Sequence, residues 1–124
     1  MELQIYIDNS DLAQERINEI TPLIQSAIAN WIKEQTLNIS LLSDSKSNIN
    51  SNLNNEKLGV HLQIKSKFKL KEPLNFLYKL AKQHKCEFVI AMVDTNSGNT
   101  EEVCYFGDEE GRPDLFEIAN YLSL

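Results

Sequence analysis

The sequence predicts an α+β fold in which five strands form a mainly antiparallel sheet. Apolar and polar residues alternate over 3–7, 37–41 and 60–70, the period of half-buried strands. Apolar residues also recur with helical spacing over 12–31 and 74–81. The resulting order β-α-β-β-α-β-β-α favours a ferredoxin-like split βαβ core with an added C-terminal strand and helix, and the strand order 5-4-1-3-2. The chain has 124 residues, a usual size for one domain, so residues 1–124 are expected to form a single domain.

The first helix is expected to run from Ser10 to about Gln35, packed beside a first strand at residues 3–7. Ser10 can cap its start, and Asp11 would lie in the first turn, where the helix dipole favours an acid. Pro22 interrupts the pattern because it cannot donate a backbone hydrogen bond. We therefore expect either a kink or two abutting helices.

The middle of the chain predicts two strands separated by a polar segment. A strand over 37–41 is followed by residues 43–57, which are rich in serine and asparagine and too polar to bury a core, so they are expected to form a mobile loop. A long third strand is expected over 60–71. One face would carry apolar residues, Phe68 among them, and the other would expose a row of lysines (Lys65, Lys67, Lys69 and Lys71).

The segment from Pro73 onward predicts a helix begun by Pro73, a strand at 88–93 and a turn around 95–100. A strand at 103–106 and a helix from about Pro113 follow. Every residue of 88–93 is apolar, which indicates a strand covered on both faces. Either the last helix crosses to the second face of the sheet, or a partner covers that face.

Cysteine and histidine usage predicts neither a disulfide nor a metal site. In a hairpin around residues 95–100, Cys104 would lie near Ala91, about five residues from Cys86, which is beyond the reach of a disulfide. Both thiols are therefore expected to be reduced. His61 and His84 have no companion ligands at metal-binding spacing.

Charge is unevenly distributed along the chain. Residues 65–85 hold seven lysines and one acid, whereas residues 94–117 hold eight acids and one arginine. The overall charge of −6 argues against nucleic acid or an anionic membrane as the main partner. The N-terminal residues do not resemble a signal peptide, and no apolar run is long enough for a membrane span, so we expect a cytoplasmic protein.

The lysine row over 65–71 has three interpretations. It can be a solvated strand face, a protection against edge-to-edge aggregation, or a contact surface for a partner or a phosphate backbone. Nucleic-acid-binding surfaces usually interleave aromatic residues or arginine with lysine, and the expected outward positions contain neither.

The segment from Tyr105 to Asp114 is the most distinctive. It places Asp108, Glu109 and Glu110 between two glycines, after a strand and before a helix. This arrangement is either a solvated turn, in which the glycines supply positive φ, or an acidic docking loop. The spacing is not that of a calcium loop, and no second group for carboxylate catalysis is visible.

Residues 104–114 (CYFGDEEGRPD), with Phe116-Glu117-Ile118-Ala119 and Tyr121-Leu122, resemble the C-terminal signature of small bacterial immunity proteins. These are cytosolic antidotes encoded beside polymorphic or contact-dependent growth-inhibition toxins. The resemblance implies specific binding to a toxin's C-terminal domain, often a nuclease, through an acidic surface.

Together these features predict a non-catalytic toxin-neutralising protein without cofactor or metal. The residues expected to contact the toxin are Glu101, Glu102, Tyr105, Asp108, Glu109, Glu110 and Asp114. Tyr105 or Phe106 can be an aromatic anchor, and the other should lie in the core, since neighbours on a strand face opposite ways. Two alternatives remain: a ferredoxin-like regulatory module that binds a small ligand as a homodimer, and a small enzyme.

Overall fold

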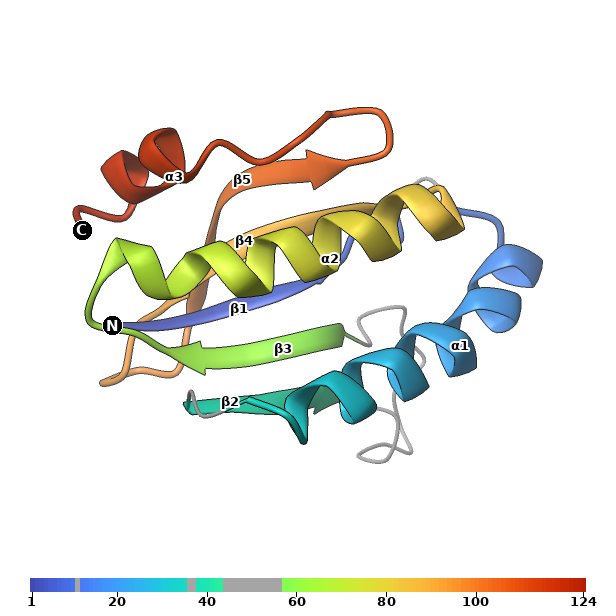
Figure 1. Cartoon of the computed structure of the whole chain (residues 1–124), viewed down its shortest axis with the longest axis horizontal. Coiled ribbons are helices and arrows are strands. Elements are labelled where there is room, and N and C mark those ends of the chain that lie inside the picture. Colours follow the sequence, from blue (N-terminus) through green and yellow to red (C-terminus); the bar gives the residue numbers. More distant parts are fainter. Residues whose placement is uncertain (11, 36–37, 44–56) are drawn as a thin grey trace.

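A computed structural model describes residues 1–10, 12–35, 38–43 and 57–124 of the chain (Figure 1). Its elements in order are β1 (Glu2–Ile7), α1 (Gln14–Ile32), β2 (Asn38–Ser43), β3 (Leu58–Gln63), the 3-10 helix η1 (Lys67–Leu70), α2 (Lys71–His84), β4 (Glu87–Val93), β5 (Thr100–Gly107) and α3 (Leu115–Tyr121). The predicted loop over 43–57 falls almost wholly outside the described residues. Ser43, its expected first residue, ends β2.

The five strands form one sheet in the order β2-β3-β1-β4-β5, and each neighbouring pair is antiparallel. This confirms the predicted α+β class and strand order. Strands β1 to β4 with α1 and α2 make the ferredoxin-like core, and β5 and α3 extend it. The central strand is β1, whose Leu3, Ile5 and Ile7 are almost completely buried.

All three α-helices cover the same face of the sheet. Side chains of α1, α2 and α3 join the inward side chains of the strands in one apolar cluster. Figure 1 shows α1 and α2 lying across the sheet, with α3 beyond the start of α2. Phe106 of β5 stacks on Phe88 of β4, with 5.7 Å between ring centroids. Of the two alternatives for the second face, the one in which the last helix crosses to it is therefore wrong, and cover by a partner stays a prediction.

No helix in the described part of the chain lies on the other face, which we call the open face. Tyr6, Val89 and Ala91 nevertheless form a small buried cluster there, with Leu42 packed against it. Lys57 lies over the Tyr6 ring, with its Nζ 4.8 Å from the ring centroid. The prediction that residues 88–93 are buried on both sides is confirmed for the middle of β4.

The predicted strand over 60–71 is wrong beyond Gln63. The described ladder of β3 ends at Gln63, and one further backbone bond runs from the Ile64 amide to the Met1 carbonyl, 2.9 Å. The chain then turns into η1, where the Ser66 hydroxyl accepts a hydrogen bond from the Phe68 amide. As a result, Phe68 is 65% exposed rather than part of the core. The lysines of the row lie on a turn and on the start of a helix, not on a strand face.

Helix α1 differs from the sequence prediction at its start and at Pro22. Ser10 does not cap the helix, because its amide and hydroxyl both donate to the Asp8 carboxylate. Asp11 lies outside the described residues, and α1 begins at Gln14. Pro22 lies inside one continuous helix, so the two-helix alternative is wrong. Ile20 and Ile24, buried on either side of it, offset the lost backbone hydrogen bond.

Both cysteines are free thiols, as predicted. Cys104 lies opposite Ile90, one residue from the expected position, because the β4–β5 register shifts between Ile90 and Ala91. Burial raises the pKa of Cys86 and of Cys104 to about 11. Neither thiol is thus activated as a nucleophile.

A methyl group at Gly59 should destabilise the centre of the sheet. A Cβ built there would lie 1.9 Å from the Ile5 carbonyl oxygen and 2.6 Å from the Tyr6 Cα. We expect Gly59→Ala to lower the free energy of unfolding by about 1–3 kcal/mol or more, measured by urea denaturation. The control is Gly98→Asn in the β4–β5 turn, where a Cβ meets no atom within 4 Å and asparagine tolerates positive φ. Equal stability of Gly59→Ala and the native protein would contradict this account.

Candidate functional site

The predicted acidic loop is a closed turn of residues 107–111, here called the acidic turn. Two backbone hydrogen bonds join Gly107 and Gly111, with N···O distances of 3.0 and 2.9 Å. The Glu87 carboxylate of β4 accepts from the Glu109 amide at 2.7 Å and from the Glu110 amide at 3.1 Å. Both glycines have positive φ, as the solvated-turn interpretation requires. The backbone of the turn is therefore held by contacts within the chain, while the Glu109 and Glu110 side chains are exposed.

On the open face, Glu102 joins two tyrosines in a cluster that we call the tyrosine–glutamate cluster. The Tyr105 hydroxyl donates to Glu102 at 2.8 Å, and the Tyr6 hydroxyl donates to it at 3.4 Å. Tyr6 lies opposite Val89, which in turn lies opposite Tyr105, so the two rings belong to one cross-strand row. Phe106 is buried whereas Tyr105 is 45% exposed, which confirms that only one of these two neighbours lies in the core.

This environment raises the pKa of both tyrosines. Burial raises the pKa of Tyr6 to about 12, and the negative charge of Glu102 adds to the effect. The pKa of Tyr105 is raised chiefly by its hydrogen bond to Glu102. Both phenols therefore stay neutral at physiological pH.

Three other predicted site residues lie outside the tyrosine–glutamate cluster. Asp108 forms an ion pair with Lys82 of α2, with 3.2 Å between Oδ1 and Nζ. Asp114 caps α3, since its Oδ1 accepts from the Phe116 and Glu117 amides at 2.9 and 3.1 Å. Glu101 is exposed near the start of β5, opposite Met92. Asp108 and Asp114 thus shape the segment, whereas Glu101, Glu109 and Glu110 present carboxylates to solvent.

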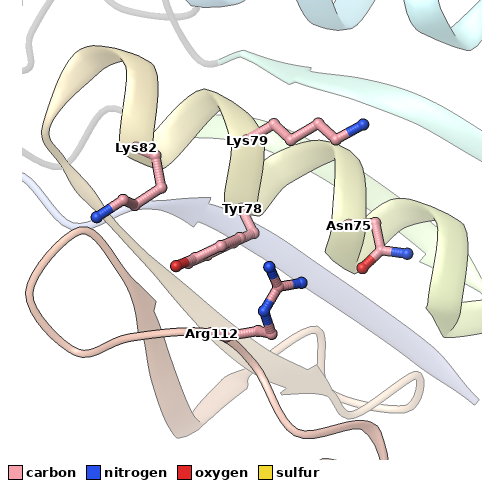
Figure 2. A pocket seen from close by; sticks show the side chains of 5 residues that line it. All are labelled: Asn75, Tyr78, Lys79, Lys82 and Arg112. Atoms are coloured by element: carbon pink, nitrogen blue, oxygen red, sulfur yellow. The ribbon is translucent and has the colours of Figure 1, made fainter.

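Sequence reasoning missed a basic groove on the other side of the acidic turn. It has a volume of about 390 Å³ and is lined by Asn75, Tyr78, Lys79, Lys82 and Arg112 (Figure 2). The first four lie on one face of α2, at i, i+3, i+4 and i+7. Figure 2 shows the Arg112 guanidinium beside the Tyr78 ring, and its Cζ lies 4.9 Å from the ring centroid. The helical spacing of the four α2 residues can be read from the sequence. The contact of Arg112 with Tyr78, however, depends on how the acidic turn packs against α2.

The lysine row contributes to an exposed aromatic pair. Lys67 Nζ lies 5.7 Å from the centroid of Phe68 and 5.5 Å from that of Phe116, which belongs to α3. Both rings are about two-thirds exposed, at 65% and 64%. The expectation that no aromatic residue is interleaved with these lysines is therefore wrong for Phe68.

Within the residues that the structure describes, no group of three or more His, Cys, Asp or Glu side chains is arranged to hold a metal ion. None of the helices in those ranges combines the length and the apolar character needed to cross a bilayer.

The tyrosine–glutamate cluster predicts a loss of stability at high pH. Folding raises the pKa of Tyr6 from its ordinary value of 10.0 to about 12, so the stabilisation that its neutral phenol contributes is complete below pH 10 and is lost as the pH rises through 12. We expect the free energy of unfolding to fall over this range in the native protein and to fall less in Tyr6→Phe. Chemical denaturation at several pH values measures this. Tyr121→Phe, at a residue that is 54% exposed, is the control. The same pH dependence in both variants would contradict the role of Tyr6.

Comparison of the chain with models of protein families, with curated proteins and with solved structures finds no match.

Proposed function

We propose that this protein is a non-catalytic immunity protein that binds a cognate toxin domain through an acidic surface and thereby neutralises it. The contact surface comprises exposed parts of β5, the acidic turn and the start of α3. Its residues are Glu101, Glu102, Tyr105, Asp108, Glu109, Glu110 and Asp114. The resemblance of residues 104–122 to immunity proteins suggested this class of partner. A nuclease is the favoured toxin, because its substrate-binding groove is basic.

The pre-ordered backbone of the acidic turn is the observation that carries the proposal. The Gly107–Gly111 bonds and the Glu87 carboxylate fix the turn without fixing the Glu109 and Glu110 side chains. A surface ordered before binding loses less conformational entropy when a partner docks. The turn thus supports specific recognition better than an unconstrained acidic loop would.

The contact residues would have different tasks. Glu101, Glu109 and Glu110 are exposed and suit steering of a basic partner and contacts at the rim of the interface. Tyr105 is half exposed and its hydroxyl is oriented by Glu102, as expected of an aromatic anchor. Asp108 and Asp114 would act mainly by keeping the segment in shape, through Lys82 and through the α3 cap.

One observation favours a second candidate, the regulatory module that pairs through its sheet. Tyr6, Val89 and Ala91 form a small apolar cluster on a face that no described helix covers. A second copy packed on this face could enclose a small ligand. The tyrosine–glutamate cluster and the His61–Glu2 pair would then be at the interface.

Reversal of charge on the acidic turn should slow association with the toxin domain. We expect the double variant Glu109→Lys/Glu110→Lys to lower the association rate constant by about tenfold or more at low salt, since opposite charges accelerate encounter. The effect should shrink as salt rises, because charges are screened over about 8 Å at physiological ionic strength. Stopped-flow mixing with the purified toxin domain encoded beside this protein measures both quantities.

The matched control is Glu15→Lys/Glu34→Lys, which makes the same change in net charge near the two ends of α1. It should alter the rate constant much less. Equal slowing by the two double variants would assign the effect to net charge and exclude the acidic turn as the steering element.

Co-expression is the direct test of neutralisation. Cells that produce the toxic domain encoded beside this protein should survive when the protein is present in excess, and a stoichiometric complex should be isolated from them. Cell death at excess protein, with no complex formed in vitro, would overturn the proposal. Sedimentation of the isolated protein as a dimer would then favour the regulatory module.

A further inference from the structure

We propose that the basic groove between α2 and the acidic turn binds the phosphate of a small phosphomonoester. This inference does not depend on the proposed function, because the groove lies beside the acidic surface and its test uses no toxin. The groove is lined by Asn75, Tyr78, Lys79, Lys82 and Arg112, and its volume is about 390 Å³. That volume falls at the lower end of small-ligand sites and exceeds what a phosphate alone requires.

The lining side chains are all hydrogen-bond donors. Lysine, arginine, the asparagine amide and the tyrosine hydroxyl can each donate to an oxyanion, and no carboxylate is among them. This composition contrasts with the chain as a whole, which has a net charge of −6. A concentration of donors in one concave place of an acidic protein indicates an anionic ligand rather than general solubility.

The arginine lies against an aromatic ring of α2. The Arg112 guanidinium lies over the Tyr78 ring, with Cζ 4.9 Å from its centroid. This is a cation–π contact, and the guanidinium N–H groups that do not face the ring can donate hydrogen bonds to an oxyanion. An oxyanion with several oxygens in a compact arrangement fits such donors.

The local charge favours a phosphomonoester over a single carboxylate. Lys79, Lys82 and Arg112 carry three positive charges. Asp108 offsets that of Lys82 through their 3.2 Å ion pair, and the charge of Glu87 also acts on Lys82. The positive charges of Lys79 and Arg112 are complementary to a phosphomonoester, which carries between one and two negative charges near neutral pH. The ion pair also fixes Lys82 against the acidic turn, so the two walls of the groove are joined at one end.

Titration of the ¹⁵N-labelled full chain with inorganic phosphate and, separately, with glycerol phosphate tests the proposal. We expect saturable chemical-shift changes centred on residues 75–82 and on Arg112. Arg112→Gln and Lys79→Gln should each weaken binding by about tenfold, the effect of losing one charge-assisted hydrogen bond. Tighter binding of glycerol phosphate would support an organic phosphate as ligand, and equal binding would support recognition of the phosphate group itself.

The matched controls are Lys33→Gln and Lys65→Gln, which remove the same charge at exposed positions outside the groove. Both control variants should leave the affinity for the phosphate probes within about twofold of the native value, because salt screens exposed charges that lie outside the groove. Urea denaturation of each variant verifies that it is folded. Absence of saturable binding of either probe, or equal weakening by groove and control variants, would overturn the proposal.

Discussion

Burial of one face of the sheet beneath all three α-helices is the constraint on which the other features depend. The central strand β1 pairs with β3 and β4 along its length, and its Leu3, Ile5 and Ile7 anchor the apolar cluster beneath the helices. No described helix remains for the opposite face, so its polar side chains bond to one another. Glu102 with its two tyrosines and the 3.0 Å contact between His61 and Glu2 are examples. Because the α-helices cover only one face of the sheet, polar side chains on the open face form hydrogen bonds with one another.

The addition of β5 to the four-stranded core creates the segment that both proposals use. Phe106 stacks on Phe88 and fixes the end of β5 to the core, and the chain then enters the acidic turn. Glu87 holds this turn from the strand layer, whereas Lys82 holds Asp108 from the helix layer. The turn is therefore tied to both layers. Its exposed carboxylates border the sheet, and Arg112, just beyond the turn, faces α2.

The basic and acidic segments of the sequence also lie on different parts of the folded protein. The basic stretch lies on η1 and α2, and the acidic stretch lies on β5, the acidic turn and α3. The Lys82–Asp108 pair joins the two, but Lys79, Glu109 and Glu110 are exposed and keep their charges available. Neighbouring surfaces of opposite sign attract ligands of opposite charge, so the two ligands that we propose would contact different residues of the acidic turn and the basic groove.

The sequence by itself determined the class of fold and the faces of the main helices, because these follow from the two- and 3.6-residue periods of apolar residues. The strand order followed from the order of the elements and the right-handed crossovers that such an order favours. The sequence also identified the glycines of the acidic turn and the exposure of one residue of the Tyr105–Phe106 pair. Only the tertiary structure decided that β3 ends at Gln63 and that the chain turns into η1, where the Ser66 hydroxyl accepts from the Phe68 amide and Phe68 lies at the surface. Likewise, the tasks of Asp108, Asp114 and Glu102 and the meeting of Arg112 with Tyr78 depend on contacts between residues distant in the chain. Periodicity reports which side of an element is buried, but only packing decides which side chains meet.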